Sequence, residues 1–414
     1  MTAFPINAVR AQFPAISGPA SAPGFLDNAA GTQVPRMVID AVAEAMISGA
    51  CNLGGRFAGS RRAEEIWDAA HLAGADIVGA PSPRGITIGA SMTALTMHIS
   101  RSIGRLCQPG DEIVLTQMDH EGDVSPWLLM AQDRGLIVRF VPFSTETWQI
   151  EPEALRAVMG ERTRLVAMNY ASNMTGSIND IKALVRIVHE FGAMAYIDAV
   201  QLVPHRLPDV VELDCDFLAC SSYKFFGPHL GVLWGRESIL EAMEPYKVRC
   251  ASDDLPGRYE VGTPQTELYA GLAATADYLA WLGSETGHAG TRRMQMLGGY
   301  AAFERHETPL TLRLIEGILA IPGTTIHGIT NPNRIAERVP TVSFTHETIP
   351  THAFAQGLAD EEIFAWSGHN YALEPARQLG LDEDTGVVRL AIAHYNTAEE
   401  IERTLAVLAR VAAQ

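Results

Sequence analysis

The segment that decides the fold is Ser221-Ser222-Tyr223-Lys224-Phe225-Phe226-Gly227-Pro228-His229-Leu230-Gly231. An apolar run at 216–220 precedes it and a second apolar run at 231–234 follows it, and each run is typical of a buried strand. A lysine between two strands is ordinarily a surface turn residue, and Lys224 by itself gives no reason to predict another role. If the fold buries it, the pKa of the amine falls and the neutral amine becomes a nucleophile toward carbonyl groups.

Three other predicted strands also end in polar side chains. They are the strand at 112–116, followed by His120, the strand at 163–168, followed by Asn173, and the strand at 194–197, followed by Asp198 and Gln201. Side chains at the carboxyl ends of buried parallel strands point into the crevice where α/β sheets hold ligands. A cofactor aldehyde held by a lysine, with an acid for its ring nitrogen, requires such a set. The sequence therefore predicts that His120, Asn173, Asp198 and Lys224 share one site.

Seven segments of the chain resemble, in the same order, the class V aminotransferases of pyridoxal-phosphate (PLP) fold type I, in their cysteine-desulfurase-like branch. The segments are 25–30 (FLDNAA), 119–121 (DHE), 172–173 (SN), 198–201 (DAVQ), 222–228 (SYKFFGP), 260–264 (EVGTP) and 393–397 (AHYNT). They span nearly the whole chain, and the spacing between Asp198 and Lys224 is the most specific of their features. The resemblance implies PLP as the cofactor.

The order of predicted elements indicates an α/β fold with two domains. Strands alternate with helices as far as residue 221, which favours a doubly wound parallel sheet. Together with the resemblance, this predicts a large PLP-binding domain at 25–280, with a mainly parallel seven-stranded sheet flanked by helices. Residues 281–414, with long helices and isolated strands at 341–344, 362–366 and 387–393, are expected to form a smaller α+β domain. Residues 1–24 are expected to form an arm that packs with the small domain.

The composition excludes several classes of partner. The chain has 414 residues and a formal net charge of −17, and its basic residues are scattered, which argues against nucleic-acid binding. We find no apolar run that reaches the ~18 residues of a membrane-spanning helix, and we expect no signal peptide and no membrane partner. The five cysteines show no paired spacing, which favours a reducing compartment, and we predict a cytoplasmic protein.

The resemblance assigns roles to the residues at the strand ends. Lys224 would bind the cofactor aldehyde and later move the Cα proton of the substrate. Asp198 would keep the pyridine nitrogen protonated, and His120 would stack on the pyridine ring. The alternatives are a helix cap for Asp198 and a structural or metal-ligating role for His120; since no second histidine lies at ligand spacing, we predict no metal site. Asn173 and Gln201 would hydrogen-bond to the phenolic oxygen of the cofactor. The alternative is that their side-chain amides only hydrogen-bond within local turns.

A turn at 89–95 (GASMTAL) follows a short strand and opens a helix. Such a turn gathers backbone N–H groups on an anion, although a serine beside a helix start is more often only a cap. The resemblance makes the turn a phosphate site, with Ser221 and Tyr223 completing it. The predicted phosphate contacts are thus Ala90, Ser91, Thr93, Ser221 and Tyr223.

Thr263, in the segment Gly262-Thr263-Pro264, resembles the residue that reaches the phosphate from the neighbouring subunit. The resemblance therefore implies a homodimer with shared active sites. The alternative for Thr263 is an ordinary turn residue.

Two C-terminal segments are expected at the substrate. Arg389 resembles the arginine that grips the α-carboxylate of the substrate, whereas its alternative is a surface arginine on an edge strand. The loop at 366–374 (WSGHNYALE) has Tyr371 where cysteine desulfurases carry their nucleophilic cysteine. We therefore expect Tyr371 to be a catalytic acid–base group, with His369 and Asn173 as further substrate contacts.

The predicted function is that of a PLP-dependent enzyme that acts on an L-amino acid. The favoured reaction is C–S bond cleavage of cysteine or a cysteine derivative, as in a lyase or desulfurase, without a persulfide on the loop. Epimerisation, transamination and decarboxylative C–C bond formation are alternatives within the same fold. Two non-enzymatic functions are also compatible with these motifs, namely a non-catalytic PLP-binding regulator and an adapter without PLP.

Overall fold

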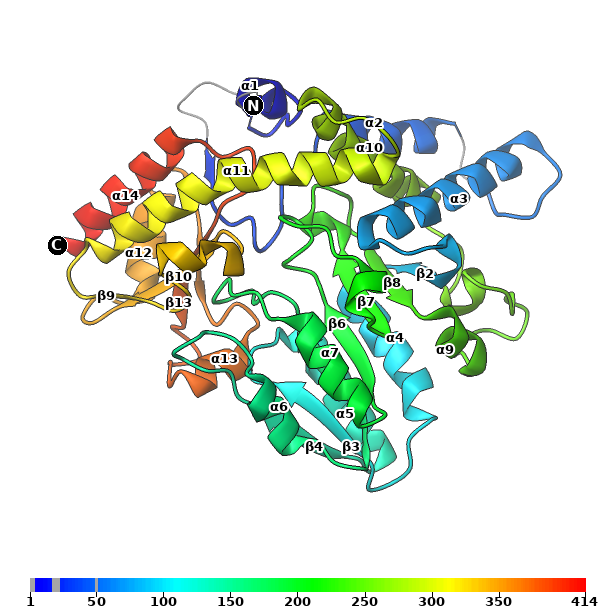
Figure 1. Ribbon diagram of the computed structural model, residues 1–414. Helices are drawn as coiled ribbons and strands as arrows, with labels where there is room; N and C mark the ends of the chain where they lie inside the picture. Colours follow the sequence, from blue (N-terminus) through cyan, green and yellow to red (C-terminus); the bar gives the residue numbers. More distant parts are fainter. Residues whose placement is uncertain (1–3, 17–22, 49–50) are drawn as a thin grey trace.

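The computed structural model describes residues 4–16, 23–48 and 51–414, and Figure 1 shows its elements. Its centre is a seven-stranded sheet in the order β2-β8-β7-β6-β5-β3-β4. The strands of this sheet are β2 (Ile86–Gly89), β3 (Glu112–Thr116), β4 (Ile137–Val141), β5 (Thr163–Asn169), β6 (Met194–Asp198), β7 (Phe217–Ser221) and β8 (Gly231–Gly235). Only β8 runs antiparallel to its neighbours in this sheet. The predicted α/β fold with a mainly parallel seven-stranded sheet is confirmed.

Helices cover both faces of the large sheet because its strands are apolar on both sides. In β6, Ala195 and Ile197 face a core shared with α3, α7 and α10, whereas Tyr196 faces a second core shared with α4 and α5. The α-helices are α1 (Ile6–Ala11), α2 (Arg36–Ile47), α3 (Ala58–Val78), α4 (Met92–Gly104), α5 (Ser125–Arg134), α6 (Pro152–Val158), α7 (Ile181–Glu190), α8 (Val210–Leu213), α9 (Glu237–Ala242), α10 (Thr266–Glu285), α11 (Arg292–Leu319), α12 (Thr351–Ala359), α13 (Leu373–Gln378) and α14 (Ala398–Ala412). Short 3-10 helices lie at Pro83–Gly85, Glu121–Asp123, Ser222–Lys224, Gly257–Tyr259 and Pro332–Glu337.

The register of the large sheet aligns the strand ends that carry the predicted site. Asn169, the last residue of β5, pairs with Asp198, the last residue of β6, and Asp198 in turn pairs with Ala219 of β7. Parallel strands joined by right-handed crossovers end at the same edge of a sheet. The segments that follow β3, β5, β6 and β7 therefore meet at one edge.

A second, antiparallel sheet lies in the C-terminal part of the chain, in the order β12-β13-β10-β9. Its strands are β9 (Thr324–Ile326), β10 (Thr341–His346), β12 (Trp366–Gly368) and β13 (Val387–Ala391). The predicted single strand at 362–366 is wrong. Ile363–Phe364 (β11) pairs instead with Gly24–Phe25 (β1), and Trp366 begins β12, because the two halves of the segment hydrogen-bond to different sheets.

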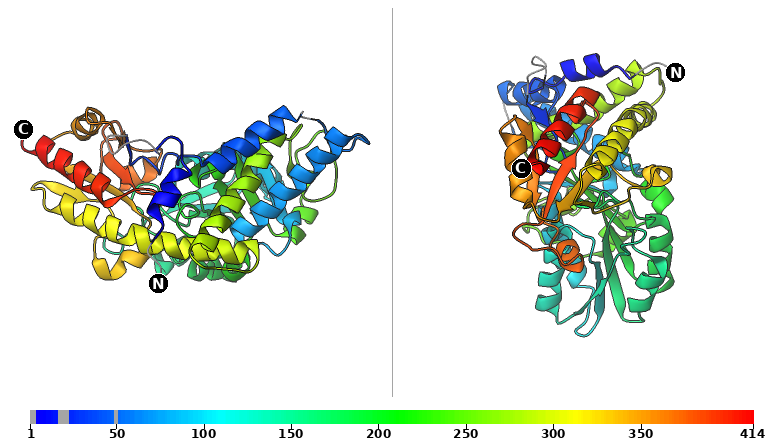
Figure 2. Two further views of the ribbon diagram at one scale, coloured as in Figure 1. Left: turned by 90° about the horizontal axis from the view of Figure 1, so that it is seen from above. Right: turned by 90° about the vertical axis from the view of Figure 1, so that its left-hand side faces the viewer.

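The N-terminal arm contacts the C-terminal part of the chain. Arg10 donates hydrogen bonds to the carbonyl of Tyr395 at 2.8 Å and to Glu400 at 2.9 Å. Both figures show α1 beside α11, between α14 and α2 (Figures 1 and 2). Residues 1–3 and 17–22 of the predicted arm lie outside the described residues.

Helix α11 crosses the molecule and packs on α10 at one end and on α14, β9 and β10 at the other (Figure 1). The predicted domain boundary at residue 280 falls inside α10, which is continuous from Thr266 to Glu285. The division into residues 25–280 and 281–414 stays a prediction. Within the described ranges, no helix combines the length and the apolar character that a membrane crossing requires.

Candidate active site

Lys224 lies between two adjoining cavities at the carboxyl edge of the large sheet. The inner cavity is lined by Met92, Thr93, His120, Asn169, Ala171, Asn173, Asp198, Val200, Gln201, Ser221, Tyr223 and Lys224. The outer cavity is lined by Asp27, Ala30, His120, Asn173, Tyr223, Lys224, Trp366, Asn370, Tyr371 and Arg389. The fold thus brings His120, Asn173, Asp198 and Lys224 together.

Burial sets the chemistry of Lys224, which ends the 3-10 turn after β7 and is only 9% exposed. Its Nζ donates a hydrogen bond to the carbonyl of Ala29. Burial first, and the charge of Arg389 second, lower the pKa of its amine to about 7. A large share of the amine is therefore neutral near pH 7 and is able to attack a carbonyl carbon.

Asp198, the last residue of β6, lines the inner cavity and is buried. Its Oδ1 accepts a hydrogen bond from the backbone N–H of Val200 at 2.8 Å. Burial raises the pKa of its carboxyl to about 6, and both this hydrogen bond and the charge of Lys224 limit the rise. Gln201, three residues later, donates from Nε2 to the carbonyl of Ala29 at 2.8 Å. The carbonyl oxygen of Ala29 thus accepts hydrogen bonds from both Lys224 and Gln201.

His120 lines both cavities, and its ring is neutral. Burial, with the charges of Lys224 and Arg389, lowers the pKa of its imidazole to about 3. Its Nδ1 accepts a hydrogen bond from the N–H of Gly122 at 2.8 Å, which leaves Nε2 as the protonated nitrogen. The ring stacks on Tyr371 with centroids 5.6 Å apart and an angle of 25° between the planes. That His120 stacks on a pyridine ring stays a prediction.

The start of α4 is joined to the segment that carries Lys224. The N–H of Met92 donates to Ser221 Oγ at 2.9 Å. This approach requires glycine at 231, because a Cβ there would lie 2.2 Å from the carbonyl carbon of Ser91. The hydroxyl of Ser91 accepts a hydrogen bond from the N–H of Ala94 at 3.1 Å and so caps α4. This is the alternative role that the sequence indicated for a serine beside a helix start.

The predicted phosphate contacts divide between two cavities. Thr93, Ser221 and Tyr223 line the inner cavity, with Ser221 and Tyr223 beside Lys224. Ala90 instead lines a separate cavity, where Thr263 of the same chain also lies. The roles of these residues toward a phosphate stay predictions.

Arg389 lies on β13, in the interior of the small sheet, and is 4% exposed. The alternative of a surface arginine on an edge strand is therefore wrong. Its Nη2 lies 3.1 Å from Oδ1 of Asp27, and its Nη1 donates to the carbonyl of Asn173 at 3.2 Å. Its buried Nε has no hydrogen-bond partner among the described residues. Burial lowers the pKa of its guanidinium, and the contact with Asp27 opposes that change.

The loop around Tyr371 closes the outer cavity. Asn173 donates from Nδ2 to the carbonyl of Asn370 at 2.7 Å, while its buried Oδ1 has no partner in the described part of the chain. The N–H of Glu121 donates to the carbonyl of Tyr371 at 2.8 Å. Asn370 and Tyr371 have φ angles of 55° and 58°, so two successive residues take the left-handed conformation and turn the Tyr371 ring toward His120. Contacts made across the cavity offset this backbone strain.

His369 does not join the residues that line the cavities. Its Nδ1 accepts a hydrogen bond from the N–H of Tyr371 at 2.9 Å, so it supports the turn of the loop. The predicted substrate contact of His369 stays a prediction.

Several cavity residues were not predicted from the sequence. Asp27 lies in the segment 25–30, which is one of those that carry the resemblance, but no signal indicated its contact with Arg389. Trp366 and Asn370 line the outer cavity from the loop at 366–374, which was expected at the substrate, but no signal in that loop singled out these two residues. Asp119 and Asp123 lie buried beside Asp198, and burial raises the pKa of each carboxyl well above its ordinary value.

No cysteine among the described residues lines either cavity. Cys107, Cys215 and Cys220 are buried, and burial raises the pKa of each thiol. Cys51 is half-buried, and Cys250 is exposed and lines a different cavity.

Comparison with known proteins gives consistent matches over the whole chain. The sequence profile of the aminotransferase class-V family matches residues 24–404. The chain is 33% identical over 420 residues to the aminotransferase-like protein FGM3 of Gibberella zeae, and the match covers 99% of each chain. It is 30% identical over 431 residues to a cysteine desulfurase of Pectobacterium atrosepticum, with 99% of this chain and 98% of the relative covered.

A solved structure has the same fold. The apo structure of a cysteine desulfurase from Thermococcus onnurineus superposes with a TM-score of 0.87 at 26% sequence identity, over 100% of this chain and 99% of the other. The match therefore includes both sheets and the helices around them.

Proposed function

Since the chain belongs to the class V aminotransferases, a family of PLP-dependent proteins, we propose that it is an enzyme that uses Lys224 to act on an L-amino acid. One observation carries the proposal. A buried amine with a pKa of about 7 lies between a buried carboxyl on one side and, on the other, an arginine whose Nε has no hydrogen-bond partner among the described residues. This arrangement suits a cofactor whose aldehyde reacts with Lys224 and whose ring faces Asp198. The carboxylate of a substrate would then bind Arg389.

The residues present fit PLP. Lys224 offers a neutral amine for the aldehyde, and Asp198 offers a carboxyl for the ring nitrogen. Asn173 Oδ1 and Arg389 Nε are buried polar atoms without partners among the described residues, so both await a partner in the cavity. The start of α4, with Thr93 and Ser221 nearby, offers the backbone N–H groups that suit a phosphate.

Bound PLP would draw electrons away from the Cα atom of the amino acid. Asp198 would hold a proton at the ring nitrogen, and His120, as a neutral ring, would pack on the cofactor face. Arg389 would orient the substrate through its carboxylate. Once released from the cofactor, the Lys224 amine would remove the proton from Cα, because burial keeps that amine largely neutral near pH 7.

For the reaction we favour C–S bond cleavage of cysteine or a cysteine derivative. Relatives at 30% identity carry the name cysteine desulfurase, which supports a sulfur-containing substrate. The absence of cysteine from the described cavity linings supports cleavage without a persulfide on the protein. The hydroxyl of Tyr371 at the mouth of the outer cavity would supply the proton for the leaving sulfur group.

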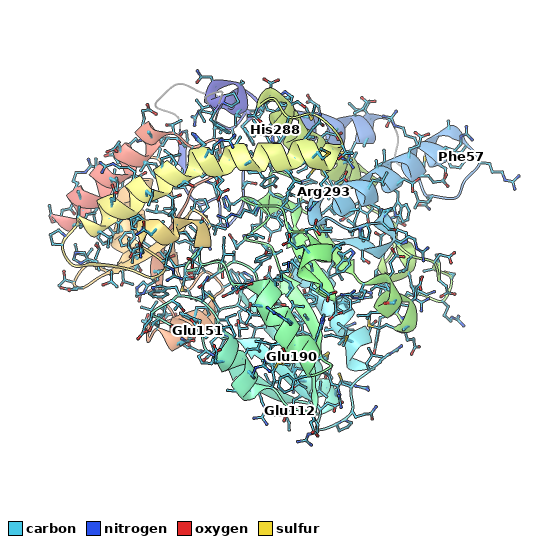
Figure 3. All side chains as sticks on the ribbon, viewed as in Figure 1. Phe57, Glu112, Glu151, Glu190, His288 and Arg293 are labelled. Atoms are coloured by element: carbon cyan, nitrogen blue, oxygen red, sulfur yellow. The ribbon has the colours of Figure 1, made fainter. Side chains whose placement is uncertain are left out.

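We further propose a homodimer with shared sites, in the cytoplasm. Exposed apolar side chains lie at the end of α2, at the start of α3 and around residue 261, among them Ile47, Phe57 and Val261. Figure 3 shows Phe57 projecting outward at the start of α3. A cavity lined by Leu53, Val248 and Thr263 joins these segments, which supports burial of this face by a second copy. All five cysteines are free, as in proteins of a reducing compartment.

The test is to incubate the purified holoenzyme with single amino acids and cysteine derivatives and to identify the products by mass spectrometry. We expect release of a sulfur product together with a three-carbon product, and loss of both in Lys224→Ala but not in the surface control Lys182→Ala. Borohydride should fix the cofactor on Lys224. A label on Lys182 or Lys247, or no product from any amino acid, would contradict the proposal. A racemised amino acid or a keto acid would instead identify an epimerase or an aminotransferase.

A further inference from the structure

Asn173 lines both cavities beside Lys224 from a short segment at 172–178, which we call the Asn173 turn. The turn lies between β5 and α7, and the N–H of Ser172 closes it by donating to the carbonyl of Ser177 at 2.9 Å. No helix or strand of its own fixes the turn. The place of the Asn173 Oδ1 atom, which has no partner among the described residues, therefore depends on what packs against the turn.

The small sheet and the segment that leads into it bind the Asn173 turn. The N–H of Val339 donates to the carbonyl of Gly176 at 2.8 Å, and the hydroxyl of Ser343, on β10, donates to the carbonyl of Met174 at 2.6 Å. Gly176 has a φ angle of 74°, and a Cβ atom there would lie 2.4 Å from the carbonyl oxygen of Thr341. The backbones of the turn and of β10 thus approach more closely than any other residue at 176 would allow.

Arg338 gathers these segments around one guanidinium that is only 4% exposed. Its Nη2 donates to the carbonyl of Thr175 in the turn at 3.4 Å and to the carbonyl of Thr341 in β10, and its Nη1 donates to the carbonyl of Ile329. Burial lowers the pKa of the guanidinium to about 10, so it is charged at pH 7. Among the described residues no carboxylate pairs with it, and backbone carbonyls offset the cost of burying this charge.

Arg338 lies behind the site rather than in it. Its side chain lines neither of the two cavities beside Lys224, and instead lines a separate cavity together with His205 and Glu307. An effect of Arg338 on the reaction therefore has to pass through the Asn173 turn.

We propose that Arg338 is a positioning residue of the active site, which holds the Asn173 turn against the small sheet and thereby fixes the place of Asn173 Oδ1. The inference rests on the proposed function, in which Asn173 meets the cofactor and the substrate, and it adds a residue that touches neither. A lysine offers one nitrogen in place of a planar fork and cannot reach the same three carbonyls in the same geometry. Arg338→Lys should therefore release the turn although the positive charge is retained.

Hydrogen–deuterium exchange of the holoenzyme, followed by mass spectrometry of its peptides, measures the turn directly. We expect faster exchange of the amides at 172–178 in Arg338→Lys. Unchanged exchange in that variant overturns the proposal. Ser343→Ala removes only the hydrogen bond to Met174 and leaves the buried charge in place, so it decides the question if Arg338→Lys does not fold. We expect faster exchange there too, and unchanged exchange again overturns the proposal.

The matched control for the exchange experiment is Arg293→Lys. Arg293 also donates to backbone carbonyls, those of Asp76 and Pro208, but in another part of the chain at the start of α11. Its replacement should leave exchange at 172–178 as in the wild type. Faster exchange at 172–178 in this control would show that any loss of a buried arginine loosens the turn, and would overturn the specific role of Arg338.

A second measurement asks whether the effect reaches the cofactor through Asn173. Hydrogen bonds to PLP tune its electronic structure, so we expect Arg338→Lys to shift the absorption of bound PLP in the same direction as Asn173→Ala. We expect kcat/KM in the product assay to fall on the order of tenfold to a hundredfold in Arg338→Lys, as for a misplaced contact group. The double variant should be no worse than Asn173→Ala alone. Additive losses overturn the proposal, because Arg338 would then act by another route.

Two further outcomes separate other causes. If urea unfolding shows that Arg338→Lys is less stable, while its exchange at 172–178 and its PLP absorption are those of the wild type, Arg338 has only a structural role and the proposal is overturned. If the wild type converts no amino acid although Lys224 holds PLP, the proposed function itself fails. Amide exchange and PLP absorption do not depend on turnover, so they still decide the role of Arg338.

Discussion

Nη2 of Arg389 lies 3.1 Å from Oδ1 of Asp27, although 362 positions separate the two residues in the chain. The contact joins the segment after β1 to the interior strand β13 of the small sheet. A parallel bridge between Asp27 and Ala391 holds the two backbones side by side. The outer cavity is therefore built from both ends of the chain, with Lys224 from its middle.

Arg389→Lys should weaken substrate binding more than turnover. A lysine offers a point charge in place of the fork and cannot bond Asp27, Asn173 and a carboxylate in the same geometry. We expect KM to rise on the order of tenfold or more, with a smaller change in kcat, in steady-state kinetics of the product assay. Arg313→Lys, in an exposed pair with Glu402, is the control and should leave both constants unchanged. An unchanged KM in Arg389→Lys would place the carboxylate elsewhere.

Lys224 should make the stability of the apo protein depend on pH. Its amine has a pKa of about 7 in the folded protein, below the ordinary 10.5, so between these values the unfolded chain binds a proton that the folded chain does not. Stability therefore falls as the pH falls from about 10.5 to 7. Lys224→Met should be more stable than wild type at pH 7, on the order of 4 kcal/mol, and equal to it above pH 10.5.

Urea unfolding of both apo proteins at several pH values measures this difference. Lys182→Met, which removes an exposed lysine, should show no such pH dependence. A difference between Lys224→Met and wild type that stays constant across the range would show that the amine is charged in the folded protein.

Asp198→Ala should retain PLP but lose turnover. Lys224 and the start of α4 remain to hold the cofactor, whereas the group that keeps its ring nitrogen protonated is gone. Removal of a buried electrostatic group of this kind commonly costs on the order of a hundredfold or more in kcat. Absorption spectra check that the cofactor is bound, and the product assay measures kcat. Unchanged turnover would mean that another group supports the ring nitrogen.

A variant without cysteine should keep most of its activity. Cys107, Cys215 and Cys220 are buried thiols with raised pKa values, and thiols in that state are poor nucleophiles. Changing all five cysteines to alanine or serine should therefore preserve most of the activity in the product assay, provided that circular dichroism shows a folded protein. Loss of activity in the single variant Cys51→Ala would instead support a mechanism in which Cys51 carries a persulfide.

Tyr371→Phe should impair the reaction, because it removes the one hydroxyl that we assign to the leaving group. The phenylalanine ring still stacks on His120, so substrate binding should change little. We expect kcat to fall on the order of tenfold to a hundredfold, with KM nearly constant, as for loss of a general acid. A normal kcat would show that solvent supplies the proton.

Sedimentation should show a dimer at micromolar concentration. The apolar groups around Ile47, Phe57 and Val261 are exposed in the single chain, and a second copy would cover them. Phe57→Glu should weaken the dimer and lower activity together, since the sites are proposed to be shared. A monomeric wild type with full activity would refute the shared site.

The sequence by itself determined the large sheet and the residues at its edge. Lys224, Asp198, Asn173 and His120 each follow a strongly apolar strand, and local patterning suffices because parallel strands end together. Burial of Lys224 does not follow from its flanking strands, because a lysine between two strands is ordinarily a surface turn residue, so the lowered pKa of its amine depends on the tertiary structure.

Only the tertiary structure decided how the substrate side of the cavity is made. The contact between Asp27 and Arg389, and the contact of Asn173 with Asn370, join segments far apart in the chain, and no local pattern encodes such pairs. The split of the segment 362–366 between two sheets likewise depends on which partner strand lies beside each half. Pairing across long separations is set by the packing of the complete fold, so a side chain such as Asp27 has no assigned neighbour until the small sheet that carries Arg389 is in place.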